Sequence, residues 1–118
     1  MGKASSVKGA QAERDLAAKL SEVLGVPVRR MLGAGRKDDI GDLDGIVGWT
    51  VQVANRANLG DTIRHKPTGC EHQQSNAGTP YGATIIKLPP QPGGKPQEWR
   101  VVMTIDQWAS VVAALGLP

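Results

Sequence analysis

The segment from Gly41 to Asn55 constrains the fold most, because its pattern fits two short strands joined by a tight turn at Gly48-Trp49. Asp42 opens the first strand, and Gln52 lies ten residues later on the second. Side chains alternate between the two faces of a strand, so residue 54 points the same way as Gln52. The sequence therefore predicts a strand-turn-strand unit that carries an acid on one strand and a polar residue on the other.

The residue types on these strands indicate metal chemistry with two parts changed. A magnesium-dependent phosphodiesterase of this layout needs Asp followed by Glu-x-Lys, and this chain has Asp42 followed by Gln52-Val53-Ala54. Asp44 is expected to point the same way as Asp42, and paired acids suit Mg²⁺ or Mn²⁺, which prefer oxygen ligands. A Gln carbonyl holds such an ion less firmly than a carboxylate. Ala54 cannot replace a lysine, and losing one such preorganised group typically costs about 10²–10³ in rate.

Glu13 is a further candidate ligand. It lies on the same helical stripe as Leu16 and Leu20, so we expect it to face the core. A carboxylate in that position needs a partner, because its desolvation is unfavourable. The partner is either a divalent cation or one of Arg29 and Arg30, unless the carboxylate stays in solvent at the edge. The sequence leaves these alternatives open.

The order of the elements predicts an α/β fold with a mixed sheet flanked by helices. A chain of 118 residues is expected to form one domain, over residues 7–118, after a flexible lead-in over residues 1–6. Residues 56–70 are expected to be mostly loop, because they include Gly60, Pro67 and Gly69. We expect helices at 7–24, 70–77 and from 104 or 106 to 115, and strands at 28–32, 43–48, 50–55, 81–88 and 99–103.

Charge and cysteine content narrow the setting. The net charge of +3 permits a polyanionic partner without requiring one. Basic residues flank the Gly-rich loop at 33–35 and would suit a phosphate backbone, although such residues also solubilise loops. The sequence has no apolar run long enough for a membrane span and no signal peptide, and its single Cys70 fits a reducing compartment. We therefore expect a cytoplasmic protein without a membrane partner.

His65, Cys70 and His72 are weak candidates for a zinc site. Their spacing is irregular, and the sequence offers no fourth ligand near them. The sequence gives these three residues no other role.

Several short motifs, in order, resemble the Holliday junction resolvases of the PD-(D/E)xK nuclease superfamily, in particular those of bacteriophages, including phages of actinobacteria, and of archaea. The motifs are Lys8-Gly9, Glu13-Arg14-Asp15-Leu16, Gly41-Asp42-Leu43, the Gly48-Trp49 turn, Val51-Gln52-Val53-Ala54-Asn55, Ser75-Asn76-Ala77-Gly78 and the strand from Trp99 to Met103 with its Thr-x-Asp-Gln continuation. The resemblance covers nearly the whole chain.

The resemblance implies a restriction-endonuclease-like fold and a Mg²⁺- or Mn²⁺-dependent endonuclease that acts as a homodimer on four-way junctions or other branched DNA. It would work in the cytoplasm of a bacterial host if the chain is encoded by a phage. Glu13 would be the helix-borne acid and Asp42 the main metal-bridging acid. Gln52 takes the place of the usual Glu, the Val53 carbonyl would add an oxygen ligand, and Ala54 occupies the lysine position.

The missing lysine leaves three explanations open. The chain is an inactivated variant, a natural copy that binds DNA without cutting it, or an enzyme whose base comes from another element. Lys87 is the first candidate for such a displaced base, and Arg56 is the second. The residues expected to contact DNA are Lys8, Arg29, Arg30, Arg36, Lys37 and Arg56.

Overall fold

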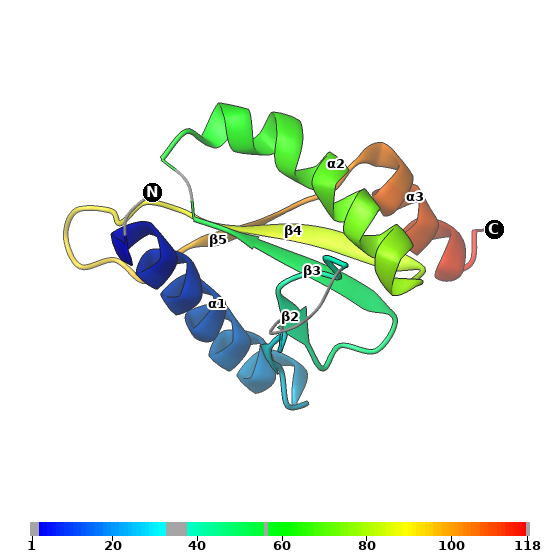
Figure 1. Ribbon diagram of the computed structural model, residues 1–118, viewed down its shortest axis with the longest axis horizontal. Coiled ribbons are helices and arrows are strands. Elements are labelled where there is room, and N and C mark those ends of the chain that lie inside the picture. The colour runs from blue at the N-terminus through cyan, green and yellow to red at the C-terminus, as the bar shows by residue number, and fades with distance from the viewer. Residues whose placement is uncertain (1–2, 33–37, 56, 118) are drawn as a thin grey trace.

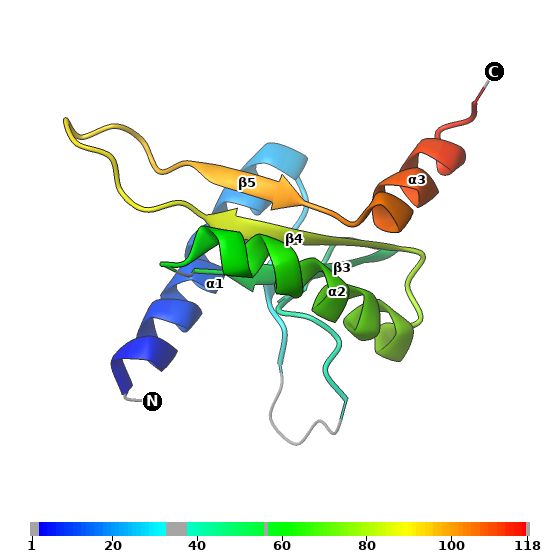
Figure 2. The same ribbon diagram turned by 90° about the horizontal axis from the view of Figure 1, so that it is seen from above.

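The computed structural model describes residues 3–32, 38–55 and 57–117, and within them the strands form one mixed sheet (Figures 1 and 2). The strands lie side by side in chain order. β3 and β4 run parallel, and the other neighbouring pairs are antiparallel. The prediction of a mixed sheet is therefore confirmed. The strands are β1 (Arg29–Arg30), β2 (Leu43–Asp44), β3 (Trp49–Ala54), β4 (Tyr81–Lys87) and β5 (Trp99–Val102).

Three helices in the described residues pack against this sheet, as the α/β prediction required: α1 (Lys3–Leu24), α2 (Leu59–Ala77) and α3 (Ile105–Ala114). Helix α1 lies on one side of the sheet, and α2 and α3 lie on the other (Figure 1). In the part of the chain that the structure describes, no helix has both the length and the apolar character that a membrane span requires.

Helix α1 covers the apolar face of the sheet. It starts at Lys3, so residues 3–6 belong to the helix and not to the predicted lead-in. It ends as predicted at Leu24, where Gly25 adopts a φ of 69° and its N–H donates to the Ser21 carbonyl at 3.0 Å. The buried core under α1 consists of Leu16, Ala17, Val28, Leu43, Val51 and Ile85.

Helix α2 corrects the prediction of a loop over 56–70. It begins after Asn58, whose side chain caps the first turn by accepting from the Asp61 N–H at 3.0 Å. Gly60, Pro67 and Gly69 all lie within the helix. Local propensity disfavours them there, but packing against the sheet outweighs it. Pro67 has no N–H for the Ile63 carbonyl, and the helix changes direction along its length (Figure 1).

The sheet face under α2 is polar. Thr50, Gln52 and Thr84 are buried there, opposite Cys70 and Gln73 of the helix. Buried polar groups need hydrogen-bond partners, and Gln52 Oε1 accepts from Thr84 Oγ1 at 3.1 Å. The two faces of the sheet therefore differ: one is an apolar core, and the other is a polar layer.

Helix α3 begins with a capping box in which Thr104 and Gln107 bond each other's backbone N–H groups at 3.0 Å. Gln107 is buried and donates to Gln74 of α2 at 2.6 Å. The predicted apolar face of this helix remains largely outside the core, since Trp108 is 56% exposed and Leu115 is 81% exposed.

Candidate functional site

Asp42 lies just before β2, and three hydrogen bonds fix it there. Its N–H donates to the Val51 carbonyl at 2.8 Å, and its own carbonyl accepts from the Met31 N–H at 2.8 Å. Its carboxylate Oδ2 accepts from the Val53 N–H at 2.8 Å. The side chain therefore continues the pairing of β2 with β3 beyond the last paired residues. These bonds leave the carboxylate in one defined orientation.

The carboxyl group of Asp42 titrates unusually high for an aspartate. Burial raises its pKa to about 6, against the lowering effect of the Val53 N–H. The charges of Glu13 and Asp39 raise the pKa further, and the charge of Lys66 lowers it. Asp42 thus lies within electrostatic reach of α1, of the segment that precedes β2 and of α2. These three elements converge on one half-buried carboxylate.

Glu13 reaches this region from α1 and has a protein partner. Its Oε1 accepts from Arg30 Nε at 2.9 Å, and its side chain is 21% exposed. The sequence left open a pair with Arg29 or Arg30, and the structure has the pair with Arg30. A metal ion between Glu13 and Asp42 would compete with this arginine.

Gln52 and Ala54 face α2, as their alternation with Val51 and Val53 requires. Gln52 is buried, and its oxygen is engaged by Thr84. Ala54 is 2% exposed. Glu13 approaches from the α1 side, so the structure places Gln52 and Glu13 on opposite sides of the sheet, with Asp42 at the strand edge.

Val53 belongs to the α1 face, and its N–H is the group that holds Asp42. Lys87, the predicted displaced base, faces α1 as well. Its Nζ lies 3.2 Å from Asp15 Oδ2 and 5.9 Å from the centre of the Trp99 ring. Lys87 is therefore directed at Asp15 and not at Asp42.

Of the predicted DNA-contacting residues, the structure describes Lys8, Arg29 and Arg30, which lie on α1 and β1. Arg29 Nε lies 3.6 Å from Asp44 Oδ2, and both side chains are exposed. Lys8 is exposed and lines a hollow together with Lys87 and Asn55. The remaining residues of this prediction, Arg36, Lys37 and Arg56, lie outside the described residues.

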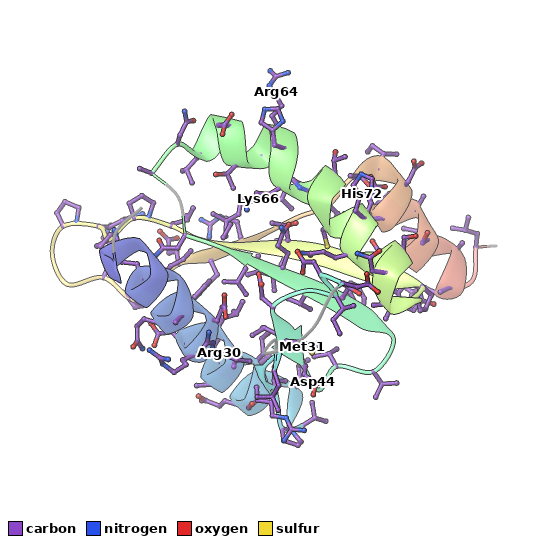
Figure 3. All side chains as sticks on the ribbon, in the orientation of Figure 1. Arg30, Met31, Asp44, Arg64, Lys66 and His72 are labelled. Atoms are coloured by element: carbon purple, nitrogen blue, oxygen red, sulfur yellow. The ribbon has the colours of Figure 1, made fainter. Side chains whose placement is uncertain are left out.

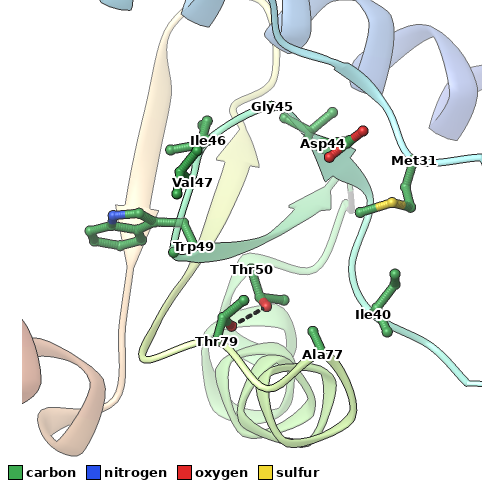
Figure 4. A pocket seen from close by; sticks show the side chains of 12 residues that line it. Met31, Ile40, Asp44, Gly45, Ile46, Val47, Trp49, Thr50, Ala77 and Thr79 are labelled. Atoms are coloured by element: carbon green, nitrogen blue, oxygen red, sulfur yellow. Dashed lines mark hydrogen bonds between the residues drawn. The ribbon is translucent and has the colours of Figure 1, made fainter.

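Asp44 belongs to a different region from Asp42. It lines a hollow between the β2–β3 turn and the C-terminal end of α2, together with Met31 and Trp49 (Figure 4). Across this hollow the hydroxyl groups of Thr50 and Thr79 share a hydrogen bond of 2.6 Å. The hollow combines apolar walls with a single acid.

The possible zinc ligands are not brought together. Cys70 is fully buried, and burial raises its pKa, whereas His65 and His72 are exposed on α2. His65 Nε2 lies 3.4 Å from Asp61 Oδ1. Within the described residues, no three His, Cys, Asp or Glu side chains are placed to hold a metal ion together. An ion at Asp42 would need ligands beyond these side chains.

Sequence reasoning missed Asp39, Lys66 and Gln73. Gln73 Nε2 donates to Asp39 Oδ2 at 2.9 Å, and Asn76 Nδ2 donates to the Asp39 carbonyl at 2.9 Å. Within the described part of the chain, the buried Oε1 of Gln73 has no hydrogen-bond donor. A helical reading of 59–77 would have placed Lys66, Gly69 and Gln73 on one face, but the loop prediction concealed that pattern.

Comparison of the chain with protein-family models, with curated proteins and with solved structures found no match. The likeness to junction resolvases therefore stays a prediction from the residues.

Proposed function

We propose that this chain is a metal-dependent endonuclease that hydrolyses phosphodiester bonds in branched DNA, with four-way junctions as its substrate. The observation that carries the proposal is the state of Asp42: a half-buried carboxylate, fixed by the Val53 N–H, whose pKa is raised to about 6 mainly by burial and further by the charges of Glu13 and Asp39. Folded proteins rarely gather acids in this way without a use for them, and such shifts concentrate at functional sites.

The donor set fits Mg²⁺ or Mn²⁺. Asp42 and Glu13 offer only oxygen atoms, which hard ions prefer. Mg²⁺ usually keeps several water ligands and is held by one or two carboxylates together with substrate phosphates. Asp42 and Glu13 would be these two carboxylates, once Glu13 has left Arg30. The Val53 carbonyl remains a further candidate ligand. Gln52 would have to release Thr84 before its oxygen could take part.

A bound divalent ion would lower the pKa of a water molecule that it binds, which makes that water a nucleophile at neutral pH. The protein's own groups position the reaction around it. The Val53 N–H keeps the Asp42 carboxylate oriented, and Arg30 donates to Glu13 while no metal ion is bound. In the hydrolysis, the water oxygen bonds to phosphorus and the bond from phosphorus to one sugar oxygen breaks. The displaced water proton ends on that sugar oxygen.

The choice of branched DNA and the homodimer come from the resemblance to junction resolvases. The exposed apolar side chains of Val101, Trp108 and Leu115 at the β5–α3 end of the molecule are compatible with self-association. Light scattering on the eluted protein should give twice the chain mass. A monomer at micromolar concentration would contradict paired cutting of two strands.

A second candidate function is binding of branched DNA without cleavage. Two observations favour it: Ala54 is buried where a lysine would be expected, and the Gln52 side-chain oxygen already accepts a hydrogen bond from Thr84. In this alternative the acids at Asp42 would be a remnant of an enzyme.

Cleavage of a labelled four-way junction in Mn²⁺ tests the two functions against each other. The unmodified chain should cut the junction in preference to a linear duplex, and Asp42→Asn should abolish cutting while keeping the acceptor for Val53. Asp44→Asn is the matched control, since Asp44 lies near Asp42 in sequence but lines a hollow to which Asp42 does not belong. Tight binding of the junction without any cleavage by the unmodified chain would favour the binding function.

A further inference from the structure

Lys66 lies on the face of α2 that is turned to the sheet. Thr62, Cys70 and Gln73 of the same face are buried, and Lys66 itself is half-buried. In Figure 3 its side chain lies between α2 and β3, whereas Arg64, two residues earlier, points away from the sheet. These spacings form the i, i+4, i+7 stripe of one helix face. Lys66 is therefore a cation aimed into the polar layer described above.

The direction of α2 sets the strand position opposite Lys66. Gln74 lies against Gly82, which is paired with Thr50 of β3. Gly69 lies about one and a half turns before Gln74 in α2. It lies against Gln52 of β3, since a Cβ added to Gly69 would be 3.8 Å from Gln52 Nε2. Earlier helix residues thus lie over later strand residues.

Lys66 lies about one helical turn before Gly69 on α2. Ala54 lies two residues after Gln52 on the same face of β3. The rise of a helical turn, about 5.4 Å, is close to the span of two strand residues, about 6.6 Å. This spacing puts Lys66 on the side of α2 that faces the Ala54 end of β3.

Among the described residues, Lys66 also has no ion-pair partner. The other half-buried lysine among the described residues, Lys87, pairs with Asp15. Lys66 makes no ion pair or hydrogen bond within the described part of the chain. Burial raises the pKa of Asp42 and the charge of Lys66 acts against that rise, yet no Lys66–Asp42 ion pair forms within 4.0 Å. The charge of Lys66 therefore acts on Asp42 without direct contact between the two groups.

Helix α2 also contacts the segment that precedes Asp42. It holds the segment before Asp42 through the bonds from Gln73 and Asn76 to Asp39. Its own ends are fixed by the Asn58 cap and by Gly78, whose N–H donates to the Gln74 carbonyl at 2.7 Å. The same helix thus carries the lysine before Pro67 and, after it, the two residues that hold the segment before Asp42.

We infer that Lys66 is the lysine of the nuclease site, supplied from α2 in place of a lysine at position 54. The inference rests on the proposed function. A substrate phosphate at this end of β3 would contact the ammonium group of Lys66, and Asp42 is the residue that would hold the ion. Lys66 stays protonated throughout. It offsets the negative charge that develops on the non-bridging oxygens as the attacking water bonds to phosphorus.

The test is single-turnover cleavage of a labelled four-way junction in Mn²⁺ by the full chain. Lys66→Met keeps the aliphatic stem and removes the charge. We expect its rate to fall by about 10²–10³, the usual effect of removing one preorganised group. Arg64→Met removes the same charge from the outer side of the same helix, and we expect it to keep the rate. Junction affinity, measured in Ca²⁺, should fall equally in both variants.

Lys66→Arg and Asp42→Asn make the outcomes separable. Lys66→Arg keeps the charge and should retain more activity than Lys66→Met, which guards against a loss that comes only from misfolding. If Lys66→Met cuts as fast as the unmodified chain while Asp42→Asn is inactive, the role of Lys66 is wrong and the proposed function stands. If Asp42→Asn still cuts, or the unmodified chain never does, the proposed function itself is wrong.

Discussion

The Asp42 carboxylate accepts the Val53 N–H at 2.8 Å at the point where the pairing of β2 with β3 has ended. Without this bond, Val53 would present an unpaired N–H at the strand edge. The same carboxylate lies within reach of Glu13 and Asp39, and burial raises its pKa to about 6. One side chain therefore has a structural duty that a neutral acceptor could perform better. In the proposed function, the negative charge of Asp42 serves to hold a metal ion.

The first prediction concerns the stability of Asp42→Asn. The pKa of the Asp42 carboxyl is about 6 in the folded chain, and the ordinary value for an aspartate side chain is 3.8. Between these values the folded chain keeps a proton that the unfolded chain has released. The free energy of unfolding of the unmodified chain therefore falls as pH rises from about 4 to 6. Asparagine lacks this charge and can still accept from Val53.

Urea unfolding in EDTA checks this prediction. Asp42→Asn should raise the free energy of unfolding at pH 8 by about 1–3 kcal/mol, and the difference should vanish below pH 4. A variant that is less stable than the unmodified chain at pH 8 would mean that the carboxylate serves the fold alone.

The second prediction concerns the competition for Glu13. Arg30→Gln removes the partner at 2.9 Å and frees the carboxylate for a metal ion. Half-exposed ion pairs are worth up to about 1 kcal/mol, so Mn²⁺ should bind up to about 5-fold more tightly. Arg29→Gln is the matched control, because Arg29 pairs with Asp44 instead. Equal effects of both variants would indicate a general change of charge and no role for Glu13.

The third prediction restores the carboxylate of the motif with Gln52→Glu. Gln52 is buried, so an added charge should lower the free energy of unfolding at pH 8 in EDTA by about 2 kcal/mol or more. Mn²⁺ should recover part of this loss, and should fail to do so when Asp42→Asn is also present. Recovery in the double variant would place the ion away from Asp42.

The fourth prediction tests the closeness of positions 54 and 66. Ala54→Lys inserts a long side chain at a site that is 2% exposed and should destabilise the fold by about 1–3 kcal/mol. Adding Lys66→Ala should relieve crowding and repulsion, giving a coupling of at least about 0.5 kcal/mol in a double-mutant cycle. The same cycle with Arg64→Ala should give none. Equal couplings would contradict the placement of Lys66 on the side of α2 that faces the Ala54 end of β3.

Local pattern predicted part of the region around Asp42. The alternation along the strand predicted at 50–55 depends on neighbours in sequence, and β3 (Trp49–Ala54) matches it within one residue at each end. The strand predicted at 43–48 is shorter, Leu43–Asp44, and the chain turns before Trp49. The end of α1 was predicted for the same reason, since Gly25 and Pro27 act locally. The start of that helix at Lys3 was not, because no strong local signal marks it.

Long-range packing decided the rest. Gly60, Pro67 and Gly69 oppose a helix locally, yet the Asn58 cap and the burial of one helix face against the sheet hold α2 together. Because that helix was missed, Lys66 was missed. The prediction of Lys87 as a displaced base took no account of its partner, Asp15, which lies 72 residues away in sequence. No spacing rule connects two residues at that separation.

Calorimetric titration of the chain with Mn²⁺ tests the central claim most directly, because that claim is a metal site at Asp42. We predict binding of Mn²⁺ by the unmodified chain, its loss in Asp42→Asn and its retention in Asp44→Asn. Unchanged Mn²⁺ binding in Asp42→Asn, or none in the unmodified chain, would contradict the account.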